Sequence, residues 1–233
     1  MKAKELGLLL DKQAYSESSM ILHFYTLERG FQSFIFKGAL KKRKALNQLG
    51  LYEINYFKRP ESDLGIVNQL DFAWTPQTLY ERPQKVLLVF FMTDILQQTL
   101  RHQGPDAKLF YFIRDQLVHL ETTDTERKFP TQFLAQYLML LGYAPLVEEE
   151  QAAIFDLQKG SFCLASQGGA TCIQDPVLVR FLKAQFWPLS TELPANSVLY
   201  KEALHILIQY AQIHLSGFEL EKTMEILHDT LYE

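Results

Sequence analysis

A run of basic residues is the feature of this sequence whose residue types and spacing best suit a chemical role. Four consecutive cations occupy positions 41–44, and further cations lie on either side of them. Each lysine or arginine that neutralises a phosphate releases a condensed counterion, so such a cluster suits contact with a nucleic-acid backbone. The alternative interpretation is a solvated surface loop. The candidate phosphate contacts are Lys37, Lys41, Lys42, Arg43, Lys44, Lys58 and Arg59.

Motifs that would support catalysis or bind a cofactor are absent from the sequence. It contains no P-loop, no G-x-G-x-x-G fingerprint and no G-x-S-x-G nucleophile elbow. His205 and His214 share an expected helix, but their nine-residue separation, at about 100° per residue, places them on opposite faces. Cys163 and Cys172 form no C-x-x-C pair, so a zinc site is not expected. We therefore expect neither an enzyme nor a bound cofactor or metal.

Short strands in the first part of the chain must position the basic run. Residues of Leu51–Phe57 alternate between apolar and polar, which is typical of a half-buried strand, and Met20–Tyr25 and Leu70–Trp74 follow the same period. Further runs at Leu6–Leu10 and Phe34–Phe36 complete about five strands, which turn signals separate. Five short strands in so few residues favour a small closed barrel over a sandwich. The basic run would then occupy a loop between two barrel strands.

Three phenylalanines precede this loop, at Phe31, Phe34 and Phe36. OB-type barrels bind single strands in a groove lined by strand faces and loops, and they use aromatic rings as stacking platforms. Because successive side chains of a strand point to opposite faces, alternation should place some of these rings in the core. We expect core packing to be their main role, with stacking as the alternative.

The hydrophobic period changes from that of a strand to that of a helix near Pro76. Residues 153–165 interrupt the helical pattern and alternate weakly around Lys159-Gly160, as a small hairpin would. Helices are expected over 86–96, 106–120, 130–141, 203–213 and 220–231. The expected fold class is therefore α+β: a β-barrel domain at 1–78, then an α-helical domain at 79–233 with a small β-hairpin insertion at about 147–174.

Charge is divided unevenly between the two expected domains. The whole chain has a formal net charge of −4, which by itself argues against a partner as acidic as DNA or RNA. Residues 1–80, however, carry 11 Lys+Arg against 8 Asp+Glu, whereas 81–233 carry 12 against 19. Any binding of nucleic acid should therefore be local to the barrel and sensitive to salt.

The overall composition is that of an ordinary globular protein, with 48% hydrophobic and 21% charged residues. No run of eighteen apolar residues predicts a transmembrane helix, and the apolar run near the N-terminus is too short for a signal peptide. Two cysteines are too few for a disulfide-stapled secreted fold. We therefore expect a cytoplasmic protein that has no contact with a membrane.

Several short motifs resemble the RecO family of DNA repair and recombination mediator proteins, and they occur in matching order. Tyr15–Ser19 is similar to an N-terminal segment of the family, Thr26–Gly30 to its T-x-x-x-G turn, and Lys37–Ala39 to its K-G-A entry into a basic loop. Leu141–Pro145 resembles its L-G-Y-x-P motif, and residues 204–227 resemble its closing helices. The similarity spans nearly the whole chain.

The resemblance implies an OB-fold barrel followed by a helical domain, which agrees with the pattern of strands and helices. It further implies a non-enzymatic protein that binds single- and double-stranded DNA and anneals complementary strands. Such a protein helps a recombinase of the RecA type to load onto DNA coated by single-strand-binding protein. The implied partners are RecR, the C-terminal tail of single-strand-binding protein and, indirectly, RecA, in a cytoplasmic and nucleoid-associated setting.

Two features depart from the family pattern. Many members carry a four-cysteine zinc module after L-G-Y-x-P, whereas residues 147–172 offer no C-x-x-C pair, so we expect the zinc module to be lost and a hairpin to remain. The chain is also acidic overall, which predicts modest intrinsic DNA affinity that depends on RecR. An alternative function stays open: a protein-interaction adaptor whose barrel binds a protein partner and not DNA.

Overall fold

The structure is a computed structural model that describes residues 2–39, 46–59, 61–124, 126–149, 152–165, 171–187 and 196–232. The chain divides into two compact units, Met1–Asp124 and Thr125–Glu233. The first helices after residue 78 lie in the same compact unit as the strands. The domain boundary expected near residue 78, where strands give way to helices, stays a prediction. Within the described ranges, no helix is both long and apolar enough to cross a membrane.

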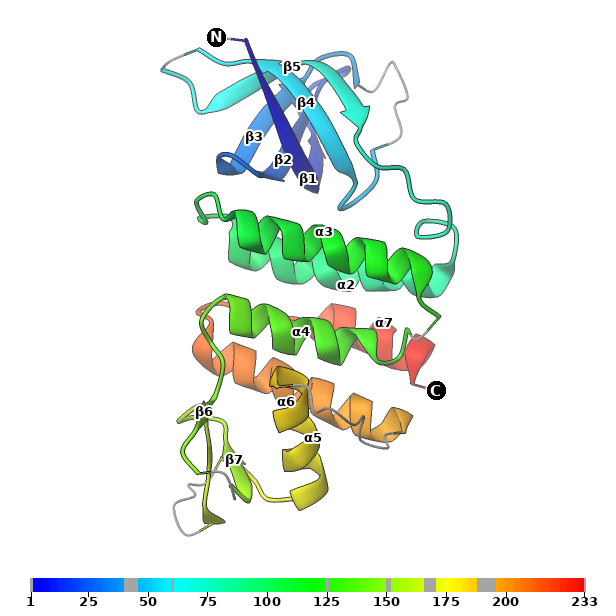
Figure 1. The fold of residues 1–233 in the computed structure, drawn as a ribbon. Helices are drawn as coiled ribbons and strands as arrows, with labels where there is room; N and C mark the ends of the chain where they lie inside the picture. The colour runs from blue at the N-terminus through cyan, green and yellow to red at the C-terminus, as the bar shows by residue number, and fades with distance from the viewer. Residues whose placement is uncertain are drawn as a thin grey trace. The chain divides into compact units, whose positions relative to one another are not determined.

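The first unit begins with a closed β-barrel, shown from blue to cyan in Figure 1. Its strands are β1 (Lys2–Ala14), β2 (Met20–Thr26), β3 (Gly30–Phe36), β4 (Leu51–Phe57) and β5 (Leu64–Phe72). Around the barrel they follow the order β1-β2-β3-β5-β4, with β3 and β5 parallel and the other pairs antiparallel. This is the arrangement of an OB-fold, and it confirms the expected fold class.

Aromatic and aliphatic side chains fill the barrel. The alternation expected in Leu51–Phe57 is confirmed, since Tyr52, Ile54 and Tyr56 are each no more than 1% exposed. Phe34 packs edge to face against Tyr56, with ring centroids 4.9 Å apart. The core cluster comprises Leu9, Leu22, Phe24, Phe34, Phe36, Ala39, Leu46, Tyr52, Ile54, Tyr56, Val67 and Leu70.

Helices α2 (Pro83–Leu100) and α3 (Ala107–Thr122) complete the first unit, and their connecting turn packs against the β2–β3 turn. The Tyr25 hydroxyl donates to the Gly104 carbonyl at 3.2 Å. Gly30 has a φ of +67°, and a Cβ atom there would lie 2.5 Å from the backbone of the α2–α3 turn. Glycine is therefore required both by the backbone conformation and by the close approach, which gives the T-x-x-x-G motif a physical basis.

Two polar side chains tie the segment before α2 to the end of α3. The Glu121 carboxylate accepts hydrogen bonds from the backbone N–H groups of Gln77, Thr78 and Leu79 at 2.7–2.9 Å. Partial burial raises the pKa of Glu121, but these donors outweigh it and hold the pKa below its ordinary value. Lys85, which is 1% exposed, donates from Nζ to the Glu121 carbonyl at 2.6 Å. The ammonium group thereby satisfies a carbonyl at the helix end.

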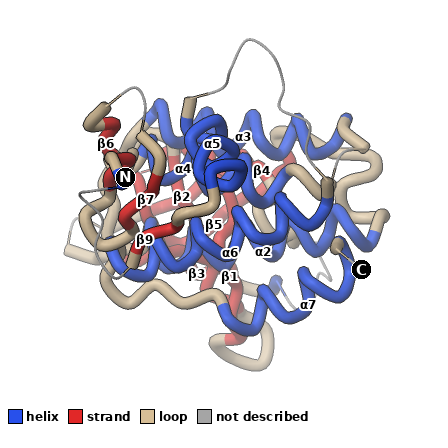
Figure 2. The backbone as a smooth tube through the Cα atoms, turned by 90° about the horizontal axis from the view of Figure 1, so that it is seen from below, coloured by secondary structure: helices blue, strands red, loops and turns tan. Residues whose placement is uncertain are grey.

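The second unit contains α4 (Phe129–Leu140), α5 (Pro176–Phe186), α6 (Ser197–His214) and α7 (Glu221–Leu231), which are blue in Figure 2. Helix α5 was not expected from the sequence, although its start carries two signals. The Asp175 carboxylate caps the helix by accepting from the N–H of Leu178 at 3.0 Å, and Pro176 occupies the first turn. Leu182 and Phe186 then lie on its buried face.

A small sheet accompanies these helices. It is formed by β6 (Leu146–Val147), β7 (Ile154–Asp156), β8 (Ser161–Cys163) and β9 (Cys172–Ile173), in the order β6-β8-β7-β9. The expected hairpin corresponds to β7 and β8, whose turn ends at Gly160 with a φ of +67°. Phe155 and Phe162 stack in the sheet with ring centroids 4.5 Å apart, and both are fully buried. Apolar packing therefore holds this sheet together.

Candidate nucleic-acid interface

The basic loop enters and leaves through residues that are anchored in the barrel. Lys41, Lys42, Arg43 and Lys44 themselves lie outside the described residues. On either side of them, Ala39 is 3% exposed and Leu46 is 7% exposed, and both belong to the barrel core. The ammonium group of Lys12 also donates to the Leu46 carbonyl at 2.6 Å. The barrel therefore fixes the two points between which the basic run must extend.

The three residues of the K-G-A motif have different structural roles. Lys37 follows β3 directly and is exposed, whereas Ala39 is buried in the barrel core. Gly38 links them with a φ of +72°, a conformation that an L side chain rarely adopts. The chain thus turns sharply between an outward cation and an inward methyl group, at the start of the basic loop.

The two other flanking cations lie at the opposite end of β3. Lys58 follows β4, and its ammonium group donates to the Gln32 side-chain oxygen at 3.3 Å. Gln32 and Lys37 are five residues apart along an extended chain, which corresponds to about 17 Å at 3.3 Å per residue. Arg59 comes next and is exposed. The fold therefore does not gather Lys37, Lys58 and Arg59 into one patch.

Two stacked rings lie on the outer face of β2 and β3, between the Lys37 end and the Lys58 end of β3. His23 is paired with Ser33 and Tyr25 with Phe31, so His23 and Phe31 are diagonal neighbours on the outside of the barrel. Their rings are nearly parallel, at 14°, with centroids 5.5 Å apart, and both residues are partly exposed. Core packing is confirmed for Phe34 and Phe36, whereas Phe31 lies outside the core.

Hydrogen bonds fix the His23 ring in place. The Gln13 amide nitrogen lies 2.9 Å from Nε2, and since that nitrogen can only donate, Nε2 accepts and Nδ1 carries the proton. Nδ1 in turn lies 2.8 Å from the Ser33 hydroxyl. Burial lowers the pKa of His23, and the charge of Arg101 lowers it further while Asp11 opposes both. The lowered pKa favours the neutral ring, and the two hydrogen bonds define its orientation.

Sequence reasoning missed His23 and the outward position of Phe31, although a signal was present. Thr26 pairs with Gly30 across the T-x-x-x-G turn. Counting outward from that pair along an antiparallel hairpin gives Tyr25 opposite Phe31 and His23 opposite Ser33. The register of the turn could thus have placed both rings on one face.

An ion pair between a buried glutamate and a partly exposed arginine lies in the same barrel, at the β2–β3 turn. Glu5 is 5% exposed, and its carboxylate lies 2.9 Å from the Arg29 guanidinium. Burial raises the pKa of Glu5, and the Arg29 charge opposes that shift. Tyr56 lies nearby, and burial together with the Glu5 charge raises the pKa of its hydroxyl. These groups link the β2–β3 turn to β1 and serve the fold.

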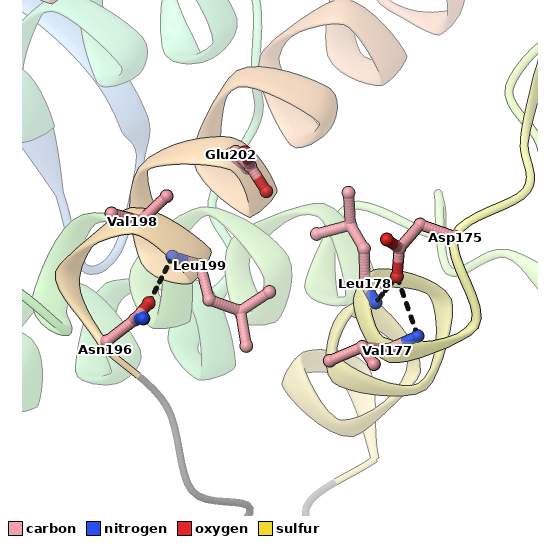
Figure 3. Close-up of a pocket in the computed structure, with 7 residues that line it drawn as sticks. All are labelled: Asp175, Val177, Leu178, Asn196, Val198, Leu199 and Glu202. Atoms are coloured by element: carbon pink, nitrogen blue, oxygen red, sulfur yellow. Dashed lines mark hydrogen bonds between the residues drawn. The ribbon is translucent and has the colours of Figure 1, made fainter.

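The helical unit holds a pocket between the starts of α5 and α6, which Figure 3 shows. It encloses about 410 Å³ and contains none of the residues expected to contact phosphate. Asp175 caps α5, and the Asn196 side chain caps α6 by accepting from the N–H of Leu199 at 2.9 Å. Both helix starts are therefore satisfied by their own side chains, which removes the usual reason for an anion to bind there.

The two cysteines occupy the small sheet as free thiols. Cys163 is buried in β8, and Cys172 is partly buried in β9. Across the part of the chain that the structure describes, no group of three or more His, Cys, Asp and Glu residues has a geometry that could hold a metal ion. Phe155 and Phe162 occupy the centre of this sheet.

The fold is that of an OB-fold protein with a helical second unit, and comparison with known proteins shows which family it resembles. The model of the recombination protein O N-terminal family matches residues 1–74, which cover the barrel. The DNA repair protein RecO of Christiangramia forsetii is 24% identical over 232 residues, which span 96% of both chains. RecO of Flavobacterium johnsoniae is 24% identical and covers 98% of this chain and 99% of its own. RecO of Syntrophus aciditrophicus is 29% identical, over 72% of this chain and 68% of its own. The chain is thus similar to RecO proteins over nearly its whole length.

Proposed function

We propose that this protein, which is similar to DNA repair proteins, is a non-enzymatic recombination mediator. In this proposal the barrel binds single- and double-stranded DNA and anneals complementary strands. It also assists a recombinase of the RecA type in loading onto single-stranded DNA coated by single-strand-binding protein. The observation that carries the proposal is the closed OB-type barrel, which the family model covers and whose basic loop starts and ends in the barrel core.

The basic loop is the proposed phosphate contact. Lys41, Lys42, Arg43 and Lys44 would bind the DNA backbone, with Lys37 beside them at the loop entry. Anchoring through Ala39 and Leu46 supports this role, because it holds both ends of the basic run at the barrel. Lys58 and Arg59 would contact the backbone separately, at the other end of β3.

Annealing by such a protein needs no catalytic group. Two complementary strands repel each other through their phosphates, and cations that neutralise those phosphates lower the repulsion. A surface that holds strands by their backbones also leaves their base-pairing edges accessible to each other. The proposal of a non-enzymatic role follows from this chemistry.

Protein partners would supply affinity for DNA that the second unit lacks. The Thr125–Glu233 unit contains 7 Lys+Arg against 13 Asp+Glu, a balance that disfavours a polyanion. We propose RecR and the C-terminal tail of single-strand-binding protein as the partners, with RecA acting indirectly. RecR would then increase the affinity of the complex for DNA above that of this chain alone.

A strand-annealing assay tests the proposal. Two complementary oligonucleotides that carry a donor and an acceptor fluorophore report pairing by energy transfer. The protein should accelerate pairing, both with bare strands and with strands coated by single-strand-binding protein, and RecR should lower the protein concentration that is required. A protein that neither accelerates pairing nor binds the oligonucleotides, with or without RecR, would instead fit the adaptor whose barrel binds a protein.

A further inference from the structure

An exposed tyrosine lies beside the entry to the basic loop. Tyr15 follows β1 directly, and its N–H donates to the Ser19 carbonyl at 2.9 Å, which closes the turn between β1 and β2. Its side chain is 61% exposed. Because Met20 pairs with Phe36, the next positions outward are Ser19 and Lys37, so this turn and Lys37 share one end of the barrel. An exposed aromatic residue and an exposed cation thus lie at the same end of the barrel.

The His23–Phe31 pair continues the same surface along the strands. Four residues of strand separate the Ser19–Lys37 end from the His23–Ser33 pair, or about 13 Å at 3.3 Å per residue. Ile21 and Ile35 pair with each other in the row between and are partly exposed. This distance is several times the 3.4 Å rise of one nucleotide in a duplex strand, so the two aromatic points would meet different nucleotides.

Cations lie at both ends of this surface. Lys37 is exposed at the Tyr15 end, and Arg101 is exposed and close enough to His23 to lower its pKa. The negative charge of Asp11 raises the pKa of His23, opposite to the effect of Arg101. The middle of the surface is therefore less positive than its ends. Aromatic rings between flanking cations suit a chain of flat bases joined by phosphates, since stacking tolerates any base and the cations meet the backbone.

We propose that the outer face of β1, β2 and β3 is a stacking track for the bases of single-stranded DNA, with Tyr15 at one end and the His23–Phe31 pair at the other. The inference rests on the DNA-binding function proposed above and adds contacts to bases where the basic loop contacts phosphates. A hydrogen bond from the Gln13 amide to His23 and a hydrogen bond between His23 and Ser33 hold one ring of the pair before DNA binds, which reduces the entropy lost on binding.

The test compares a labelled thymine oligonucleotide with an abasic oligonucleotide of the same length and charge, by fluorescence anisotropy on the full chain. Wild-type protein should bind the thymine oligonucleotide at least about fivefold more tightly, because each stacked base contributes measurably to affinity. The Tyr15→Ala variant should lose about fivefold or more on thymine and nothing on the abasic strand. Phe31→Leu, which keeps an apolar side chain beside His23, should change binding in the same direction.

Tyr111→Ala is the matched control, because Tyr111 is also an exposed tyrosine of the first unit, at 39%, but lies on α3. It should bind both oligonucleotides as wild type does. Equal wild-type affinity for thymine and abasic strands, with Tyr15→Ala unchanged, would overturn the stacking track and leave DNA binding through the loop intact. Absence of salt-sensitive binding to either strand would overturn the proposed function as well. Thermal melting of each variant confirms that it is folded.

Discussion

The two compact units bury similar side chains but differ in what they leave on the surface. Aromatic residues fill both cores, Phe34 and Tyr56 in the barrel and Phe155 and Phe162 in the small sheet. Residues 1–124 carry 16 Lys+Arg against 14 Asp+Glu, and four of those cations are consecutive, whereas residues 125–233 carry 7 against 13. The two units thus share a mode of core packing, and the difference in charge is the reason we propose the first unit as the one that binds DNA.

The largest expected effect comes from removing the basic run. Replacing Lys41, Lys42, Arg43 and Lys44 with alanine should reduce the salt slope of single-strand binding by about 3, from about 0.7 per phosphate contact. At low salt this corresponds to a loss of affinity of roughly a thousandfold. Anisotropy titrations across a range of salt concentrations measure both quantities.

The matched control replaces four cations of the second unit, Lys159, Arg180, Lys183 and Lys201, with alanine. It removes the same charge and should leave the salt slope unchanged. If the two quadruple variants lost affinity equally, net charge and not the barrel loop would govern binding, and the contrast between the units would disappear.

Truncating the aromatic centre of the small sheet should weaken the second unit selectively. Phe162→Ala leaves a cavity in a fully buried site, so the free energy of unfolding of that unit should fall by about 3 kcal/mol or more. The chain has two tryptophans, Trp74 in the first unit and Trp187 beside Phe162 in the second. Urea titrations in Trp74→Phe and Trp187→Phe backgrounds report each unit separately. Equal shifts of both transitions would mean that the units unfold as one.

Gly30 and Gly38 have similar positive φ angles but different surroundings. Substituting each with alanine therefore distinguishes the cost of backbone strain from the cost of a steric clash. Gly30→Ala should destabilise it by about 2 kcal/mol or more, because the Cβ atom adds a clash with the α2–α3 turn to the strain of a positive φ. Gly38→Ala has the same strain with open space around it and should cost about 1 kcal/mol. Thermal melting compares the two, and equal losses would refute the packing of Gly30 on the α2–α3 turn.

The smallest effect concerns acid stability. The pKa of Glu121 is held below its ordinary value of 4.5, so the unfolded chain binds this proton more readily than the folded one. Ionised Glu121 therefore stabilises the first unit above about pH 4.5, and this contribution is lost as the pH falls through the folded pKa. Glu121→Gln should lower the free energy of unfolding by about 1 kcal/mol at pH 7. Urea titrations followed by Trp74 should show that the difference shrinks below pH 4.5, and a constant difference would contradict this account.

Much of the fold could be predicted from the hydrophobic period alone. The alternating pattern of Tyr52, Ile54 and Tyr56 predicts β4 within its observed bounds. Lys159-Gly160 predicts the turn of the β7–β8 hairpin. Helix α5 was missed although Asp175 and Pro176 form a recognisable start. The pattern also could not show that α2 and α3 belong with the barrel, because that grouping depends on contacts such as Tyr25 with Gly104, far apart in sequence.

The candidate site was harder to predict, because side chains are gathered by strand register and not by proximity in the sequence. The basic loop is a single run and was evident at once. Lys37 and Lys58 flank it in the sequence but lie at opposite ends of β3. His23 and Phe31 are eight residues apart and yet stack, because the β2–β3 turn brings them onto one face.

A salt-dependent titration of the purified full chain with labelled single-stranded DNA tests the central claim, that the barrel unit binds DNA through its basic loop. We expect saturable binding at low salt. The logarithm of the association constant should fall linearly with the logarithm of salt concentration, with a slope of about −3 or steeper for four or more phosphate contacts. Absence of saturable binding at low salt, or binding whose strength does not change with salt, would contradict it.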